Sequence, residues 1–379
     1  MDTRSQDTEV LFHPTRIGSL ELKNRIVMAP MTRAMSPGGV PGENVARYYR
    51  RRAENDVGLI VTEGAFIDPD TAVHDGNAPR FYGDALEAWR GVVDEVHHAG
   101  GRIFPQLWHV GLIRKPKVAG TGAVFDNGAK HTSAISPSGV IGGNGLPLER
   151  VGDPATTRQI KAIIQAYGRA ASAAQRLHFD GVEVHAAHGY LIDQFLWEKT
   201  NLREDEYGGD LTRRTRFATE VIREIRGQVG PAFPVVIRLS LWKQQDYTAK
   251  LVTTAQEWAA IVEPLVAAGV DGFHLSQRRY WEGEFGTGLN LAAWTKKLTG
   301  KPAITVGSVT LDNSTAEMMQ GKGSSAIDNI ASLLSSLARG DFDLVAIGRA
   351  LIANPDWARR IRDRAFLKPY ALNLLQTLD

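Results

Sequence analysis

Three side chains that can hold or move protons lie in one short segment, His185-Ala-Ala-His188-Gly-Tyr190. Neutral imidazoles can donate N–H hydrogen bonds to a carbonyl, nitro or phenolate oxygen, and a tyrosine hydroxyl can deliver a proton. The segment therefore predicts a site in which two histidines hold an oxygen and Tyr190 acts as an acid. Two alternatives stay open at this point, because paired histidines also bind zinc and because both rings could be purely structural.

A second group of residues is suited to a phosphate. Two apolar runs end in Gly307-Ser308 and in Gly348-Arg349. Glycine lets backbone N–H groups approach a ligand closely, and the arginine guanidinium offers a fork of donors that matches phosphate oxygens. We therefore expect these four residues to bind a phosphate group. No Gly-x-Gly-x-x-Gly sequence follows an apolar run, so a Rossmann dinucleotide fold is not expected.

Three more polar or aromatic side chains stand where apolar runs end. A buried Arg238 is costly unless it meets an anion or a polarised ring, and an internal ion pair with Glu63 or Glu183 is the alternative. Gln106 offers a donor and an acceptor together, which suits the edge of a heterocycle such as a flavin. Trp108 either packs in the core or forms the wall of a pocket.

The elements that must position these residues repeat along the chain. Eight short apolar runs occupy residues 25–30, 58–64, 102–108, 181–186, 234–240, 271–276, 302–307 and 343–348. Helical patterns follow several of them, over residues 85–98, 154–177, 211–229 and 254–268. Near-continuous apolar strands that alternate with helices indicate parallel strands buried on both faces. Eight units predict an α/β fold, a (β/α)₈ TIM barrel, as one domain over residues 1–379.

In such barrels the working residues lie where strands end and the following loops begin, which is where every candidate above stands. Metal-dependent barrel hydrolases usually carry a His-x-His pair after the first strand. This chain reads Ala29-Pro30-Met31-Thr32 there, so no metal is expected. The connection over residues 109–152 is unusually long and rich in glycine and proline. Because long connections are usually functional, we expect a capping loop or hairpin over the barrel mouth, with a disordered insertion as the alternative.

Composition excludes several classes of function. The 379 residues contain no cysteine, so disulfides, thiolate metal sites and cysteine nucleophiles are absent. Lys and Arg number 44 against 42 Asp and Glu, without a basic stripe, so nucleic acid is not an expected partner. The N-terminal residues are polar and no run of eighteen apolar residues occurs, so neither a signal peptide nor a membrane span is expected. A cytoplasmic monomer or homodimer is the resulting expectation.

Several motifs in barrel order together resemble one family. They are Phe12-His-Pro-Thr, Leu22-Lys-Asn-Arg-Ile-Val-Met-Ala-Pro-Met-Thr, HAAHGYLIDQFL (185–196), NLREDEYGG (201–209) and VAIGRALIANPDW (345–357). Across nearly its whole length the chain resembles the Old Yellow Enzyme family of FMN-dependent NAD(P)H:ene oxidoreductases. The resemblance implies FMN as cofactor, NADH or NADPH as reductant, and a small-molecule activated alkene as substrate.

The resemblance also implies a role for each candidate. Residues near the flavin would be Ala29, Pro30, Met31, Thr32, Gly64, Gln106, His185 and Arg238, with Gly307, Ser308, Gly348 and Arg349 at its phosphate. The substrate would meet Thr32, Trp108, His185, His188 and Tyr190. A nicotinamide would reduce the flavin and leave, and the flavin would then give a hydride to the β-carbon of an enone, enal, maleimide or nitroalkene. Tyr190 would protonate the α-carbon, while the two histidines stabilise charge on the activating oxygen.

The chain departs from the family pattern at four places. No cysteine stands near Thr32, and the tail over residues 369–379 looks shorter than the segment that closes the pocket in the yeast enzymes. We therefore expect the loop after the sixth strand to supply the missing wall through Tyr280 and Trp281, with surface aromatics as the alternative. Leu241 and Thr310 stand where the family pattern leads us to expect Gln and Gly.

Three rival functions are weighed against this prediction. A related flavin barrel could act on dienoyl thioesters, N-methylated amines or nitrate esters, although the relatives that reduce dienoyl thioesters or oxidise N-methylated amines usually carry an iron–sulfur cluster and a Rossmann domain. A metal-dependent barrel hydrolase and a flavin-free phosphate-binding isomerase barrel are the other two. A purified yellow protein that releases FMN would exclude both of these last classes.

Overall fold

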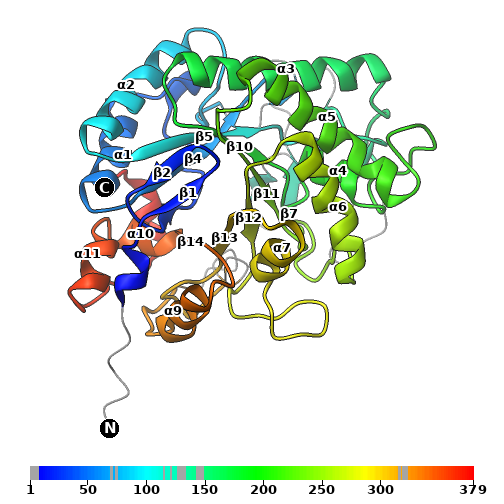
Figure 1. The fold of residues 1–379 in the computed structure, drawn as a ribbon. Helices are drawn as coiled ribbons and strands as arrows, with labels where there is room; N and C mark the ends of the chain where they lie inside the picture. The colour runs from blue at the N-terminus through cyan, green and yellow to red at the C-terminus, as the bar shows by residue number, and fades with distance from the viewer. Residues whose placement is uncertain are drawn as a thin grey trace.

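Eight parallel strands form a closed barrel with helices around it (Figure 1). The computed structural model describes residues 8–68, 71–72, 76–113, 116–119, 122–125, 134–141, 149–314, 317 and 323–379. The barrel strands are β3 (Ile26–Met28), β4 (Leu59–Phe66), β5 (Arg102–Trp108), β10 (Val182–His185), β11 (Val235–Leu239), β12 (Gly272–Ser276), β13 (Ala303–Val306) and β14 (Leu344–Ile347). Each lies within or across one of the eight predicted apolar runs, and the (β/α)₈ prediction is confirmed.

The strands pair in chain order, and the ring closes where β14 pairs with β3 and β10 pairs with β5. Register brings functional candidates to the same height: His185 pairs with Arg238, and Arg238 pairs with His274. On the other side of β10, in the neighbouring strand β5, Gln106 pairs with Gly64 after a bulge in β4. Parallel strands therefore deliver these side chains to one end of the barrel.

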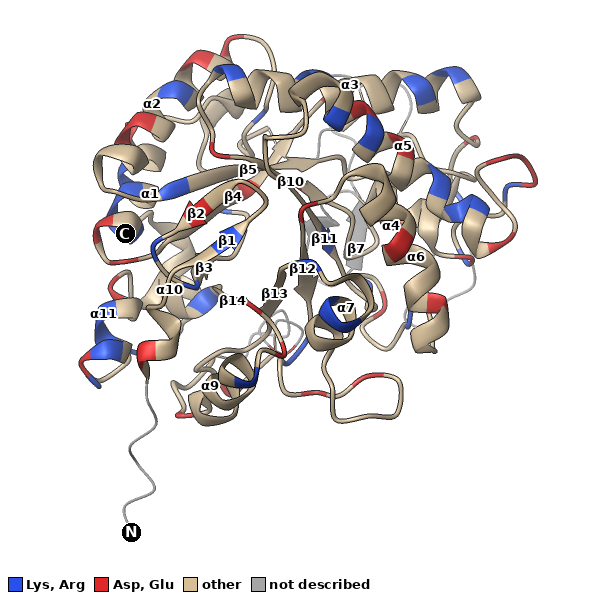
Figure 2. Ribbon diagram, viewed as in Figure 1, with Lys and Arg blue, Asp and Glu red and all other residues tan. Residues whose placement is uncertain are grey.

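Helices cover the outside of the barrel. They are α1 (Glu43–Glu54), α2 (Ala85–His98), α3 (Thr157–Arg176), α4 (Leu191–Leu196), α5 (Leu211–Val229), α6 (Ala255–Ala268), α7 (Leu291–Thr299), α9 (Ile330–Arg339), α10 (Arg349–Ala353) and α11 (Trp357–Arg362). Local sequence sets their starts, because Thr156 and Thr254 each form a capping box with the residue three positions on. Acidic and basic residues are interspersed along these outer helices (Figure 2).

The end of the barrel opposite the candidate residues is closed by an N-terminal hairpin. Strands β1 (Thr15–Ile17) and β2 (Leu20–Leu22) pair antiparallel. The hairpin contributes Ile17 and Leu22 to an inner apolar cluster that also contains Phe104 and Val236. Because this end is filled by side chains, the opposite end is the one available for ligands.

The long connection after β5 contains two antiparallel strand pairs among its described residues. Strand β6 (Pro116–Ala119) pairs with β7 (Gly122–Phe125), and β8 (Val140–Ile141) pairs with β9 (Glu149–Arg150). Other parts of the connection lie outside the described residues, so its predicted role as a cap stays a prediction.

The described residues also contain three short 3₁₀ segments: η1 (Thr8–Leu11), η2 (Pro37–Gly39) and η3 (Leu372–Gln376). The last of these lies in the tail, whose backbone carbonyls at Leu374 and Thr377 accept hydrogen bonds from the Arg33 guanidinium. The tail is thereby held against the loop that follows β3. None of the described helices combines the length and apolar character needed to cross a membrane.

Candidate active site

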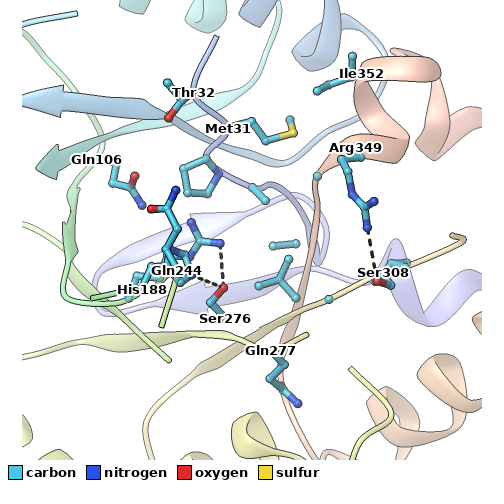
Figure 3. A pocket seen from close by; sticks show the side chains of 18 of the residues that line it. Met31, Thr32, Gln106, His188, Gln244, Ser276, Gln277, Ser308, Arg349 and Ile352 are labelled. Carbon is cyan, nitrogen blue, oxygen red and sulfur yellow. Dashed lines mark hydrogen bonds between the residues drawn. The ribbon is translucent and has the colours of Figure 1, made fainter. Parts of the chain in front are cut away.

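A cavity of about 370 Å³ opens at the carboxyl ends of the barrel strands (Figure 3). Its predicted lining residues are Ala29, Pro30, Met31, Thr32, Gln106, Trp108, His185, His188, Tyr190, Arg238, Gly307, Ser308, Gly348 and Arg349. This volume is in the range typical of small-molecule and cofactor sites. The structure thus brings residues from six strand ends, far apart in sequence, into one space.

His185, His188 and Tyr190, at and just after the end of β10, form a compact aromatic cluster. The His185 ring centroid lies 5.1 Å from that of His188 and 4.9 Å from that of Tyr190, each pair edge to face. The Ala187 N–H donates to His185 Nδ1 at 3.3 Å, which leaves Nε2 as the protonated nitrogen of a neutral ring. His188 Nε2 lies 2.7 Å from Ser276 Oγ.

Burial keeps this cluster neutral. It lowers the pKa of both His185 and His188 well below the ordinary value, and the Arg238 charge lowers both further. Burial likewise raises the pKa of Tyr190, against the opposing effect of Arg238. The Tyr190 hydroxyl has no hydrogen-bond partner within the described ranges. At neutral pH the site therefore offers imidazole N–H donors and a protonated phenol.

The peptide between the two catalytic candidates is clamped from both sides. Asp193 Oδ2 accepts the Gly189 N–H at 2.6 Å, and Gln194 Nε2 donates to the Gly189 carbonyl at 2.7 Å. Asp193 also forms an ion pair with Lys243, and both side chains are fully buried. The clamp holds His188 in the left-handed region at φ 65°, which costs a non-glycine residue about 1–2 kcal/mol.

Polar groups form the floor of the cavity. Gln106 Nε2 donates to the Glu183 carboxylate at 2.8 Å, and His274 Nδ1 contacts the same carboxylate at 2.7 Å. Arg238 makes no ion pair within the described part of the chain. One of its nitrogens donates to Ser276 Oγ at 3.3 Å, and its Nε has no partner. The predicted alternative of an internal ion pair for Arg238 is therefore wrong within the described ranges.

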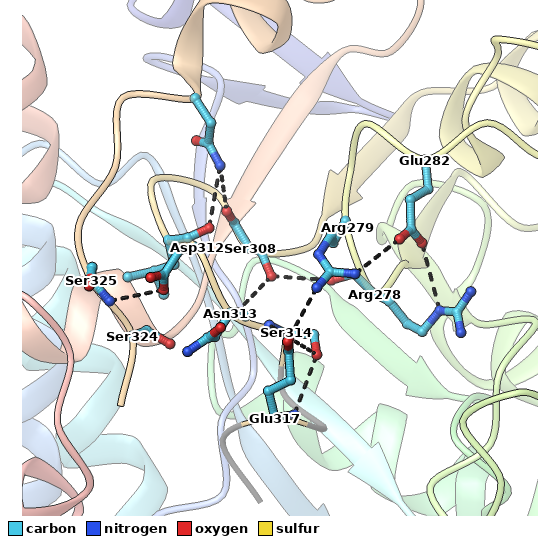
Figure 4. Close-up of polar contacts among 12 residues, drawn as sticks. Arg278, Arg279, Glu282, Ser308, Asp312, Asn313, Ser314, Glu317, Ser324 and Ser325 are labelled. Carbon is cyan, nitrogen blue, oxygen red and sulfur yellow. Dashed lines mark hydrogen bonds and ion pairs between the residues drawn. The ribbon is translucent and has the colours of Figure 1, made fainter. Parts of the chain in front are cut away.

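The far end of the cavity holds a cation that only neutral groups contact. Arg349 donates to Ser324 Oγ at 3.0 Å, to Ser308 Oγ at 3.5 Å and to backbone carbonyls in the loop after β13 (Figure 3). Figure 4 shows this loop tied together by hydrogen bonds, including Ser308 Oγ to the Asn313 carbonyl at 3.0 Å. Arg349 has no carboxylate contact among the residues described. Its charge is therefore available to an anion.

Two glycines among the predicted residues have different reasons to be glycine. A Cβ at Gly307, whose φ is 149°, would lie 2.7 Å from the Gln277 carbonyl oxygen. At Gly64 a Cβ would lie 2.5 Å from the Trp108 ring. Gly64 is absent from the lining, and its small size instead seats Trp108, which stacks on Phe66 with centroids 5.0 Å apart.

The expectation for the pocket wall needs correction. Tyr280 and Trp281 do not line the cavity: the Tyr280 hydroxyl turns away to the Asn329 carbonyl and to Ser332, and Trp281 is exposed at the surface. The loop after β12 turns back on itself, since the Tyr280 N–H donates to the Gly307 carbonyl. The tail supplies wall residues despite its short length, through Tyr370 and Leu375.

Sequence reasoning missed the other wall, which follows β11. Trp242 stacks on His188 with centroids 4.3 Å apart, and Tyr247 stacks on the other face of Trp242 at 4.7 Å. Gln244 from the same loop lines the cavity beside them. Two aromatics, Trp242 and Tyr247, in the loop that follows a strand end on the working face were the signal that could have identified this wall.

Leu241 and Thr310, the two positions where the family pattern led us to expect Gln and Gly, are both buried. Leu241 packs in the hydrophobic core at the start of the same loop. Thr310 lies in the left-handed region at φ 56°, although it is β-branched, and its Oγ accepts the Trp357 indole N–H at 3.0 Å. The hydroxyl thus satisfies a buried donor at a position that otherwise favours glycine.

Metal-ligand geometry is not found within the described ranges, where no three His, Asp or Glu side chains are grouped to hold an ion. The two site histidines instead contact Ser276 and a backbone N–H.

Comparison with known proteins identifies the family. Residues 10–367 match the model of the NADH:flavin oxidoreductase / NADH oxidase family. Over its full length the chain is 33% identical to 12-oxophytodienoate reductase 7 of Oryza sativa subsp. japonica, covering 94% of that protein. Among solved structures, morphinone reductase is 30% identical with a TM-score of 0.78, covering 96% of this chain and 92% of that one.

Two further structures extend the comparison. Morphinone reductase in complex with tetrahydroNAD matches equally well, with a TM-score of 0.78. The old yellow enzyme homologue from Zymomonas mobilis is 29% identical with a TM-score of 0.76, covering 96% of each chain. The chain therefore belongs to the NADH:flavin oxidoreductase / NADH oxidase family, as a member of the Old Yellow Enzyme group, and is an NAD(P)H-dependent flavin oxidoreductase.

Proposed function

We propose that this protein is an ene-reductase that uses FMN and NADH or NADPH to reduce the C=C bond of an activated alkene. The substrate class is an enone, enal, maleimide or nitroalkene. The observation that carries the proposal is the cluster of two neutral imidazoles beside a protonated phenol with an unpartnered hydroxyl, at one end of the cavity. These groups suit an electron-poor alkene whose activating oxygen gains charge as the bond is reduced.

The residues present fit FMN. Gln106 and Arg238 offer an amide and a guanidinium with an unpartnered Nε to the polar edge of an isoalloxazine ring. At the far end, Gly307 and Ser308 line the cavity, and among the described residues only neutral groups contact the Arg349 guanidinium. Ala29, Pro30, Met31 and Thr32 would line the ring between them. Bound FMN supplies the hydride chemistry that these side chains lack.

The protein's own groups perform the remaining tasks. His185 presents its Nε2–H, and His188 a second ring nitrogen, to the substrate's activating oxygen. Their low pKa values keep these donors neutral, so that they stabilise charge without transferring a proton. Tyr190 donates its hydroxyl proton to the α-carbon, and Trp108 and Trp242 exclude water from one side of the site.

Separating the two half-reactions tests the proposal. The purified protein should be yellow and release FMN on denaturation. Its flavin should bleach anaerobically with NADH or NADPH and be reoxidised by an enone, a maleimide or a nitroalkene. Tyr190→Phe should slow reoxidation by an enone by about 10²–10⁴-fold, the usual contribution of a general acid, and leave reduction by the nicotinamide nearly unchanged.

Tyr167 provides a matched control for this variant. It is fully buried on α3, and its hydroxyl also has no partner. Tyr167→Phe should therefore leave both half-reactions unchanged. Equal loss of both half-reactions in Tyr190→Phe would refute the role of Tyr190 as proton donor, and a colourless protein without FMN would refute the proposed function.

A further inference from the structure

A carboxylate is held inside the barrel directly below the cavity. Glu183 stands two residues before His185 on β10, so both side chains point to the inner face of the barrel. The Glu183 side chain is 0% exposed. Its two oxygens are taken by Gln106 Nε2 at 2.8 Å and by His274 Nδ1 at 2.7 Å. None of the roles described above uses this carboxylate.

Glu183 carries a negative charge in this environment. Burial alone would raise its pKa, but His274, the Arg238 charge and the hydrogen bond from Gln106 outweigh it and hold the pKa below the ordinary value. Burial lowers the pKa of His274, against the raising effect of the Glu183 carboxylate. The carboxylate and the Arg238 guanidinium are therefore opposite charges that act on each other without touching.

The charge of Glu183 fixes the direction of the Gln106 amide. A carboxylate can only accept hydrogen bonds, so the amide nitrogen must face Glu183. The amide oxygen then faces away from Glu183, as the acceptor that Gln106 offers to a ligand in the cavity that it lines. The lining of the cavity consequently includes an acceptor from Gln106 and a cation from Arg238.

We propose that Glu183 is a positioning residue that holds the Gln106 acceptor toward the cavity and offsets part of the Arg238 charge, so that bound flavin keeps a low reduction potential. The inference rests on the proposed function. Reduced flavin gains negative charge, which a nearby guanidinium stabilises and a nearby carboxylate opposes. Glu183 thereby preserves the tendency of the reduced cofactor to pass its hydride on to the alkene.

Glu183→Gln removes the charge and can keep both hydrogen bonds. The new amide oxygen can accept from Gln106, and its nitrogen can donate to His274 Nδ1 once that ring protonates at Nε2, which has no partner now. We expect the equilibrium constant for flavin reduction to rise at least tenfold, which is a positive shift of about 30 mV for a two-electron couple. The midpoint potential is measured by anaerobic dye-coupled titration of the FMN-loaded protein.

Two controls separate charge from structure. Glu183→Asp keeps the charge but shortens the side chain, so the reduction constant should stay within threefold, about 15 mV, while FMN affinity weakens because Gln106 is released. Asp271 sits at the opposite end of the barrel, where it pairs with Arg226, and Asp271→Asn should leave the potential unchanged. Circular dichroism and the unfolding midpoint of each variant check the fold.

The outcomes distinguish the two proposals. A flavin-loaded wild type with an unshifted or more negative potential in Glu183→Gln would overturn this inference alone, as would an equal shift in Asp271→Asn. If Glu183→Gln does not fold, Glu183→Asp decides, because a positive shift beyond about 15 mV with the charge retained would overturn the inference. A wild-type protein that binds no FMN would overturn the proposed function and this inference with it.

Discussion

Replacing Lys243 by methionine should be among the most destabilising single changes in the chain. The Lys243–Asp193 pair is fully buried on both sides, and Asp193 has no second cation in contact within the described ranges. Removing one partner of a buried pair leaves the other charge uncompensated and costs about 3–5 kcal/mol. Scaled to 379 residues, the entropy of unfolding is about 0.8 kcal/mol per kelvin. Dividing the loss of stability by this entropy gives a fall in the thermal unfolding midpoint of about 4–6 °C.

The assay is thermal unfolding of both single variants and of the double variant Asp193→Asn/Lys243→Met, followed by circular dichroism at one scan rate. The double variant leaves no buried charge and keeps an acceptor for the Gly189 N–H. It should therefore lose less than the two single variants together. Arg47→Met is the control, because the Arg47–Glu43 pair is largely exposed and such pairs contribute only about 0–1 kcal/mol.

The same variant tests the clamp on the catalytic loop. Gly189 lies between the two proposed catalytic side chains, so Lys243→Met should slow flavin reoxidation by an enone more than flavin reduction by the nicotinamide. The reasoning is refuted if Lys243→Met has the same unfolding midpoint as the wild type. It is also refuted if the loss of stability in the double variant equals the sum of the losses in the two single variants.

The remaining predictions concern the site and its titration. Replacing both His185 and His188 by alanine should abolish the long-wavelength band that a phenol gives with bound flavin, because its oxyanion loses both donors; an unchanged band contradicts that role. Arg349→Ala should yield flavin-poor protein, measured as the ratio of FMN to protein, and full occupancy would exclude a phosphate role. Burial lowers the folded-state pKa of His185, His188 and His274, so only the unfolded chain gains their protons below about pH 6.5. Stability should therefore fall from pH 7.5 to pH 5.5, by at most about 1.4 kcal/mol per pH unit for each histidine, and urea unfolding that shows a rise would contradict the assignment.

The barrel could be predicted closely because parallel strands covered by helices are apolar throughout. Helices α2 and α5 begin and end at the predicted residues. Helix α1 escaped notice because its sequence, ENVARYYRRRAE, is strongly polar, and its buried face is confined to a few positions that include Tyr48 and Tyr49. The spacing of apolar residues therefore predicted elements with many apolar positions and missed a helix with few of them.

The candidate site was predictable where residues stand at strand ends, since parallel strands bring those ends together. The walls were not. The Trp242–Tyr247 wall depends on a loop held through the distant Lys243–Asp193 pair, and Leu375 reaches the cavity because Arg33 binds the tail from more than 340 residues away. Sequence spacing does not reveal such long-range contacts. For this reason the prediction that Tyr280 and Trp281 form the wall of the cavity was wrong.

The stacked rings of Trp242 and Tyr247 stand on a different loop from Tyr190 and most of its neighbours. Under the proposed function, the residues that would select a substrate and the residue that would donate the proton thus belong to separate segments of the chain. We expect substitutions in residues 244–250 to change which molecules enter the cavity while Tyr190, the proposed proton donor, stays in place. A barrel organised in this way can acquire new substrates through one variable loop, without rebuilding the chemistry that it inherited.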